Sequence, residues 1–136
     1  MQFFEIKVRY ARNNGEDNAA TIKETYIVED ITFGAAEKRV IESIAPLAIG
    51  DIDIVSMKKT KIYDFVNVVA DKSFFKCKVE LITIEESGKE KRTKVVYYVG
   101  AESIEDARKR ICAEIASYDA DLKSVEETNV EEIIRL

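Results

Sequence analysis

The chain has 136 residues, the length of one ordinary domain or of two very small ones sharing a core. Hydrophobic residues make up 46% and charged residues 35%, a composition that excludes disordered, collagen-like and low-complexity chains. The formal net charge of -5 gives no global positive field for nucleic acid or anionic membranes. Histidine is absent, which removes the commonest general base and the commonest metal ligand.

The amino terminus meets charged residues at once and has no uninterrupted apolar core, so we do not expect a secretory signal. No apolar run approaches the roughly 18 residues of a membrane span. Cys77 and Cys112 lie far apart, and each occupies an apolar position of a periodic pattern. From the net charge and the short apolar runs we expect no membrane partner. The cysteine positions are typical of buried, reduced thiols in a cytoplasmic protein, with a disulfide or reactive thiol as the alternative.

The second half of the chain repeats residues of the first half at a nearly constant spacing. One shift aligns residues 3–10 and 26–45 with residues 74–81 and 97–116, and it matches Phe3 with Phe74 and Tyr26 with Tyr97. The same shift superposes Lys38-Arg39 on Lys109-Arg110. A slightly shorter shift then matches Asp51 and Asp53 with Asp119 and Asp121. We therefore predict an internal duplication.

The first copy begins with a strand whose alternate residues are apolar, Phe4, Ile6, Val8 and Tyr10. A hairpin turn is predicted at Asn13-Asn14-Gly15, followed by a second strand over about residues 21–28. Thr32 is the expected N-cap of a helix with one apolar stripe, Phe33, Ala36, Val40, Ile44 and Leu47. A third strand starts near Asp51, and a short apolar segment, residues 62–66, ends the copy.

The second copy repeats these elements in the same order. Its first strand carries Phe75, Cys77, Val79 and Leu81 on one face, and a turn follows at Glu86-Ser87-Gly88-Lys89. After a strand over about residues 93–99, Ser103 is the expected N-cap of a helix with the stripe Ile104, Ala107, Ile111, Ile115 and Tyr118. A strand starts near Asp119, and residues 130–134 form the last apolar segment.

Each copy therefore reads as a β-β-α-β unit of an α+β protein. We expect the first repeat at residues 1–66, a connector at residues 67–73 and the second repeat at residues 74–136. Because one such unit has a thin core, we expect both to pack about a pseudo-two-fold axis into one compact domain. The strands would form two antiparallel sheets or one joined sheet, with two helices.

Several segments resemble a known family. They are the aromatic pair Phe3-Phe4 before Lys7-Val8, the run Tyr26-Ile27-Val28, the helix opening Thr32-Phe33, and Ile54-Val55-Ser56-Met57-Lys58-Lys59. These residues look like the uncharacterised proteins of Bacteroidetes and their phages known as domain of unknown function 4494. The similarity covers almost the whole chain, although family members usually carry tryptophan-tyrosine where this chain has Phe3-Phe4 and Phe74-Phe75. The resemblance implies the architecture and a mobile-element setting, and it implies no catalytic residue.

No recognised nucleophile, phosphate-binding loop or cofactor motif occurs, so we expect no cofactor. The best carboxylate candidates are two repeated pairs, Asp51 with Asp53 and Asp119 with Asp121. Alternate strand positions put both carboxylates of a pair on one face, where they could bind a hard divalent cation. The simpler interpretation is that they end a helix, open a strand and solvate a turn.

Basic residues gather on the second predicted hairpin and on both predicted helices, where they could contact phosphates. The candidates for nucleic-acid contacts are Lys38, Arg39, Lys89, Lys91, Arg92, Lys94, Arg108, Lys109 and Arg110. The alternative is that these residues form ordinary solvated faces.

The surfaces of the two copies differ in charge. Lys58, Lys59 and Lys61 align with Glu126, Glu127 and Asn129, so equivalent strands could pair side by side, or between chains. The alternative is drift on an exposed surface. Six apolar residues are expected on the sheet face away from the helices: Phe3, Ile27, Phe74, Ile82, Val96 and Tyr98. Such a face suggests a sheet covered by the other repeat or by a partner.

These observations favour a non-enzymatic cytoplasmic accessory protein that acts by protein association, including self-association. Nucleic-acid binding through the lysine and arginine patches is the competing hypothesis. An enzyme that relies on carboxylates and a metal, or on Cys77 or Cys112, is the third.

Overall fold

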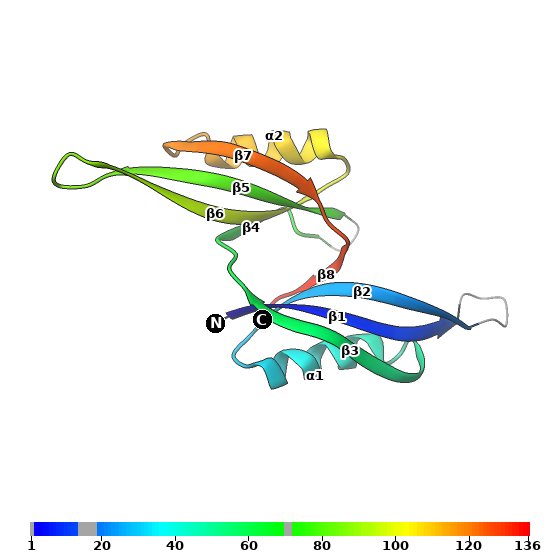
Figure 1. Cartoon of the computed structure of the whole chain (residues 1–136). Helices are drawn as coiled ribbons and strands as arrows, with labels where there is room; N and C mark the ends of the chain where they lie inside the picture. Colours follow the sequence, from blue (N-terminus) through cyan, green and yellow to red (C-terminus); the bar gives the residue numbers. More distant parts are fainter. Residues whose placement is uncertain (1, 14–18, 70–71) are drawn as a thin grey trace. The chain divides into compact units, whose positions relative to one another are not determined.

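The computed structural model describes residues 2–13, 19–69 and 72–136 (Figure 1). In chain order the elements are β1 (Gln2–Asn13), β2 (Ala19–Asp30), α1 (Phe33–Ile44), β3 (Ala48–Thr60), β4 (Asp64–Val66), β5 (Ser73–Ile84), β6 (Glu90–Ala101), α2 (Ile104–Ile115), β7 (Ala120–Glu127) and β8 (Val130–Ile134). The predicted α+β class is confirmed. Asn14 and Gly15 of the first predicted turn lie outside the described residues. No described helix is long and apolar enough to cross a membrane.

The strands form two four-stranded sheets, with the orders β3-β1-β2-β8 and β4-β6-β5-β7. In each sheet the long strands are antiparallel: β1 pairs with β2 and β3, and β5 pairs with β6 and β7. The short strands β8 and β4 pair in parallel with β2 and β6. Of the two predicted arrangements, the described residues adopt the one with separate sheets. The two sheets have the same order of equivalent strands, while the duplication itself stays a prediction.

The two short strands are exchanged between the sheets. One compact unit comprises residues 1–60 and 129–136, and the other comprises residues 61–128. The expected boundaries were residues 1–66, 67–73 and 74–136, so the structure divides the chain differently. The chain passes between units after Thr60 and after Thr128. The predicted connector, residues 67–73, falls within the second unit, between the end of β4 and the first residue of β5, and its residues 70–71 are outside the described part. Apolar patterning identifies a strand, but β2 and β6 offer equivalent edges, so it does not say which edge the strand joins.

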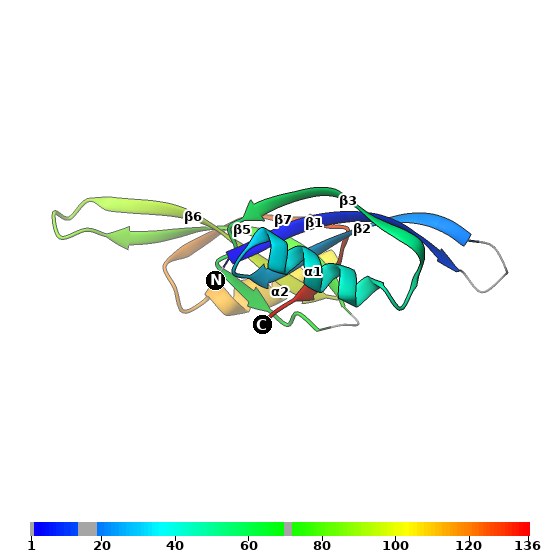
Figure 2. The ribbon, with the colours of Figure 1, turned by 90° about the horizontal axis from the view of Figure 1, so that it is seen from below.

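The core of the first unit lies between its sheet and α1, which lies along one face of the sheet (Figure 2). Alternation turns Phe4, Ile6 and Val8 of β1 toward the helix, and all three are fully buried. The predicted stripe of α1 meets them through Ala36, Val40 and Ile44, while its ends, Phe33 and Leu47, remain exposed. The Thr32 hydroxyl accepts a hydrogen bond from the Ala35 amide at 3.1 Å, as expected for the N-cap.

The second unit repeats this packing with different side chains. Cys77, Val79 and Tyr97 are buried against Ala107, Ile111 and Ile115 of α2. At the N-cap, the Ser103 hydroxyl accepts from the Asp106 amide at 3.1 Å, and the Asp106 carboxylate accepts from the Glu102 amide at 3.2 Å. The hydrogen bond from the Glu102 amide and the one from Arg110 lower the pKa of Asp106. The predicted N-cap of this helix is thus present, and Asp106 adds a reciprocal hydrogen bond as in a capping box.

A close backbone approach links the segment after β4 to the end of β6. Asn67 has a φ of 53°, in the left-handed region that few residues other than glycine adopt. Its side-chain amide donates to the Gly100 carbonyl at 3.0 Å. A Cβ atom at Gly100 would overlap the Asn67 carbonyl, so this position requires glycine.

Candidate functional site

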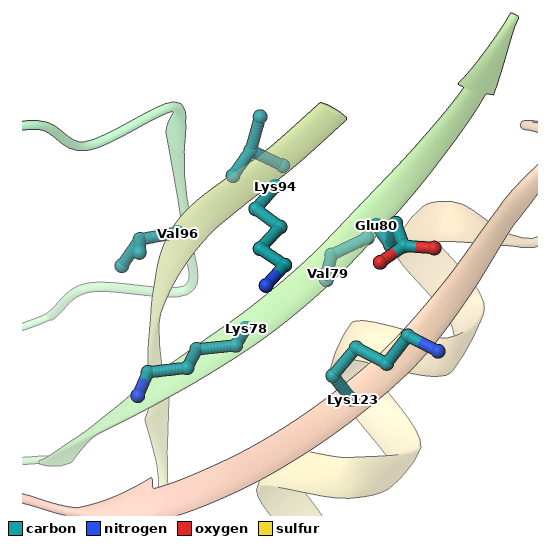
Figure 3. A pocket seen from close by; sticks show the side chains of 7 residues that line it. Lys78, Val79, Glu80, Lys94, Val96 and Lys123 are labelled. Carbon is teal, nitrogen blue, oxygen red and sulfur yellow. The ribbon is translucent and has the colours of Figure 1, made fainter. Parts of the chain in front are cut away.

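A groove of about 620 Å³ opens on the second sheet, within the unit formed by residues 61–128. Three adjacent strands line it: Lys78, Val79 and Glu80 come from β5, Lys94, Val95 and Val96 from β6, and Lys123 from β7. The charged side chains stand around the groove, and the ammonium of Lys94 lies over β5 (Figure 3). Three of the four charged residues that line the groove are therefore lysines.

A second groove of about 260 Å³ shares Lys94, Val95 and Val96 with the first. It adds Lys61, Ile62 and Tyr63, the segment that enters β4. The Tyr63 amide donates to the Val96 carbonyl at 2.7 Å, and its ring lies 5.3 Å from the Tyr97 ring, centroid to centroid. Tyr63 is nevertheless 56% exposed, so the combined lining of the two grooves, which we term the lysine groove, includes an exposed tyrosine.

The single carboxylate of the lysine groove is already neutralised. The Arg92 guanidinium contacts Glu80 at 2.9 Å, Glu90 at 3.1 Å and Asp121 at 3.5 Å. The hydrogen bond from Arg92 is the main reason that the pKa of Glu80 is lowered, and the charges of Lys123 and Lys94 add to the effect. The groove therefore keeps an excess of positive charge.

The lysines of the groove differ in their intrachain partners. Lys78 forms an exposed ion pair with Glu126 at 3.3 Å. Among the described residues, neither Lys94 nor Lys123 has a carboxylate within ion-pair distance. These two ammonium groups are thus available to an external anion.

A β-bulge sets the position of Lys123. In the ladder between β5 and β7, Lys78 pairs with Ser124 and the next residue pairs with Leu122, so Lys123 is the extra residue. The ladder between β1 and β3 has an equivalent bulge, where Lys7 pairs with Ser56 and Val8 with Ile54. The extra residue there is Val55, which is 48% exposed. The same irregularity thus presents a lysine on one sheet and an aliphatic side chain on the other.

The predicted nucleic-acid candidates separate into two groups. Arg39 and Arg110, which the repeat had made prominent, have structural partners: Arg39 contacts Asp30 at 3.5 Å and donates to the Glu29 carbonyl at 2.7 Å, and Arg110 contacts Asp106 at 3.2 Å. Arg92 is held by its three carboxylates. Lys94 lines the lysine groove. The others are exposed, Lys89 and Lys91 on the hairpin that extends past β7 (Figure 1), and Lys38, Arg108 and Lys109 on the helices.

The predicted carboxylate pairs do not assemble a metal site. Asp53 pairs with Arg9 at 3.3 Å, and Asp121 pairs with Arg92. Asp51 and Asp119 are exposed. No group of three potential metal ligands occurs among the described residues. The repeated spacing is therefore explained by the start of an edge strand in both sheets.

The six apolar residues expected on the outer sheet faces are largely buried. Ile27, Phe74 and Tyr98 are between 0% and 4% exposed, and Phe3, Ile82 and Val96 are half-buried. The ring centroids of Tyr98 and of Phe65 in β4 are 6.5 Å apart. Ile27 is the strand-register partner of Ile133 in β8. A covered face was expected, and these residues do not form an open apolar surface.

The charged strand residues have local partners. Lys58 contacts Glu5 at 2.9 Å, and the Lys59 ammonium lies 5.9 Å from the centroid of the Phe33 ring. Lys61 belongs to the second groove, Glu126 pairs with Lys78, and Glu127 is exposed. Because β3 and β7 are edge strands of different sheets, the predicted side-by-side pairing within one sheet is wrong. Pairing between chains stays a prediction.

The two cysteines occupy different environments. Cys77 is buried, and burial raises the pKa of its thiol to about 11. Cys112 is exposed on α2, which corrects the expectation of two buried thiols: the residue falls beside the apolar stripe rather than within it. Neither forms a disulfide.

Comparison with known proteins gives the family of the chain and no function. No curated protein matches it. One family model matches residues 2–136, nearly the whole chain, and so covers both sheets and both helices. The match extends over both units described above, and it assigns neither an activity nor a ligand. The chain therefore belongs to the family described as Domain of unknown function (DUF4494).

Proposed function

We propose that the protein is a non-enzymatic accessory protein that acts by associating with proteins, including its own copies. The observation that carries this proposal is the outer edge of β3. This 13-residue strand lies at the end of its sheet, and only β1 pairs with it among the described residues. The unpaired groups of an edge strand can accept an extended segment of another chain.

The side chains along this edge support the same function. Ile49 and Val55 are both close to half exposed, although they are aliphatic. At the equivalent bulge of the second sheet the residue is Lys123, a type of residue that disfavours edge-to-edge pairing. The two edges therefore differ in chemistry, and β3 is the better docking edge. We further propose a cytoplasmic location, on the ground of the two free thiols, and, following the family resemblance, a phage or mobile-element setting.

The test is photocrosslinking from the β3 edge. A photoreactive amino acid at Val55 is expected to crosslink to a protein, whether a second copy or a host protein, in cells that express the full chain. The matched control places the same amino acid at Lys38, an exposed residue of α1. Light scattering after size-exclusion chromatography then reports whether the partner is a second copy.

Val55→Lys should preserve the fold, because lysine occupies the equivalent bulge of the second sheet. In the chain without a photoreactive residue, this variant should abolish the associated species seen by light scattering. A strict monomer with no more crosslinking at Val55 than at Lys38 would contradict the proposal.

A further inference from the structure

We propose that the lysine groove binds single-stranded nucleic acid. The groove belongs to the second unit and is separate from the β3 edge, so this inference does not depend on the association proposed above. Its ligand would be recognised by two features, a row of ammonium groups for the phosphates and an exposed ring for a base.

The ammonium groups come from four segments that are distant in the sequence. Lys61 precedes β4, while Lys78, Lys94 and Lys123 lie on three neighbouring strands. The two grooves share Lys94, Val95 and Val96 in their lining. A polyanion that follows this surface therefore meets successive positive charges.

The local carboxylates do not cancel this charge. Glu80 and Asp121 are held by Arg92, and Glu126 is held by Lys78 at 3.3 Å. Because the Lys78–Glu126 pair is exposed, Lys78 can exchange Glu126 for a phosphate at little cost and leave that carboxylate to solvent, so all four lysines can contact the ligand. The charged groups left for a ligand are ammonium groups, which bind phosphate as point charges.

The aromatic feature is Tyr63, which lines the groove beside Lys61 and Lys94. Its contact with Tyr97 holds one part of the ring, and 56% of the residue remains accessible. A ring held in this way can stack on an unpaired base, whereas bases inside a duplex are not available for stacking. This is why the inference specifies a single strand.

The experiment measures the fluorescence anisotropy of a labelled oligothymidine of about 20 nucleotides, longer than the ~4–16 nucleotides that a single-strand-binding fold covers. Four phosphate contacts predict that log K falls with log salt with a slope of about -2.8. Affinity should therefore fall about 50-fold between about 50 and 200 mM NaCl.

Two variants test the assignment of residues. The double variant Lys94→Gln/Lys123→Gln should reduce the steepness of the salt dependence to about -1.4, because two contacts are lost. The charge-matched control Lys38→Gln/Lys109→Gln changes exposed lysines on the helices and should leave the slope unchanged. Tyr63→Ala should weaken binding about fivefold or more, whereas Tyr63→Phe should retain it.

The following results would overturn the inference. Absence of oligothymidine binding at the lower salt concentration would remove the site. An unchanged slope for the Lys94/Lys123 variant would place any binding elsewhere. Equal affinity for a duplex, or for an oligoglutamate of the same charge, would show that charge alone acts and that no base is recognised. Circular dichroism of each variant checks that the fold is intact.

Discussion

The carboxylate of Glu5 lies 2.9 Å from the ammonium of Lys58, its direct cross-strand neighbour between β1 and β3. At the equivalent place in the second sheet, Lys76 stands opposite Glu126 in the strand register, and the Glu126 carboxylate forms its ion pair with Lys78 on the same strand. The signs are reversed at both positions, so each sheet keeps one opposite-charge pair there. Opposite charges on equivalent strands therefore satisfy a local requirement in each unit and need no second chain to explain them.

Reversing the charge of Glu5 should destabilise the protein, and reversing the charge of Lys58 as well should restore the stability. Glu5→Lys places two ammonium groups opposite each other and should lower the free energy of unfolding by about 0.5–1 kcal/mol. Adding Lys58→Glu reproduces the arrangement of the second sheet and should recover most of this loss. Urea unfolding of the single and double variants measures the coupling. As a control, Glu42→Lys makes the same charge change on the exposed face of α1, and a similar loss there would contradict the pairing.

Replacing Gly100 by alanine should destabilise the second unit. The new Cβ atom would overlap the Asn67 carbonyl, and the backbone must shift to relieve the contact. We expect a loss of about 1–3 kcal/mol, as for other overpacked sites. Gly34→Ala is the matched control, because no atom lies within 4 Å of its added Cβ, and it should be neutral or slightly stabilising. Equal thermal stability of both variants would show that the space between Gly100 and the Asn67 carbonyl can hold a Cβ atom.

The thiols should differ sharply in reactivity. At pH 8, iodoacetamide should label Cys112, which is exposed, and leave Cys77 unlabelled in the folded protein. The reason is twofold: Cys77 is buried, and its pKa of about 11 keeps the thiolate rare. Intact-mass spectrometry should show one adduct in the native protein, none in Cys112→Ser, and two in wild-type protein unfolded by urea. Two adducts under native conditions would contradict the burial of Cys77.

The Glu80–Arg92 pair should contribute to acid sensitivity. The hydrogen bond from Arg92 lowers the pKa of Glu80 in the folded state, so the pair stabilises the fold above the unfolded-state pKa of about 4.3. The contribution is lost as the pH falls through the lower, folded-state pKa. Glu80→Gln should therefore lose less stability than wild type on acidification below about pH 5. Unfolding by urea at a series of pH values measures the difference, and parallel curves would contradict the assignment.

Removing the last strand should affect the first sheet selectively. A chain that ends at Thr128 lacks β8, which pairs with β2 from Thr25 to Val28, and also lacks the Arg135 carbonyl that accepts from Arg39 at 3.0 Å. We expect a loss of about 3 kcal/mol or more from the first unit. Hydrogen exchange should accelerate at the amides of β2 and remain slow at those of β5. Equal acceleration in both sheets would contradict a unit-specific role of β8.

Sequence patterns predicted the elements well, because each is determined locally. Alternation marks β1 and β5, and the hydroxyls of Thr32 and Ser103 mark the helix starts, all as observed. The exchange of β4 and β8 depends on which of two similar edges a strand meets, and local patterning carries no information on that choice. A bulge is equally hidden, because one extra residue leaves the apolar pattern almost intact.

The lysine groove was missed for a related reason. Its lysines lie on four segments, and of these only Lys61 and Lys94 were among the candidates, each in a different set. A signal was nevertheless present: the repeat shift that matches the strands also superposes Lys7 on Lys78 and Lys23 on Lys94, at polar positions. Lysines that recur on the solvent-facing side of both hairpins indicate a shared basic surface more directly than runs of adjacent charges do.

The exchanged strands also set the order in which a ribosome can complete the molecule. The second unit is one continuous stretch, Lys61–Thr128, whereas the first needs Asn129–Leu136 as well as the opening part of the chain. The part synthesised first is thus the last to be finished, the reverse of the amino-terminal-first order in which domains usually form during translation. While residues 1–128 are being synthesised the edge of β2 has no β8 beside it, and it can be paired only after residues 129–136 have been made.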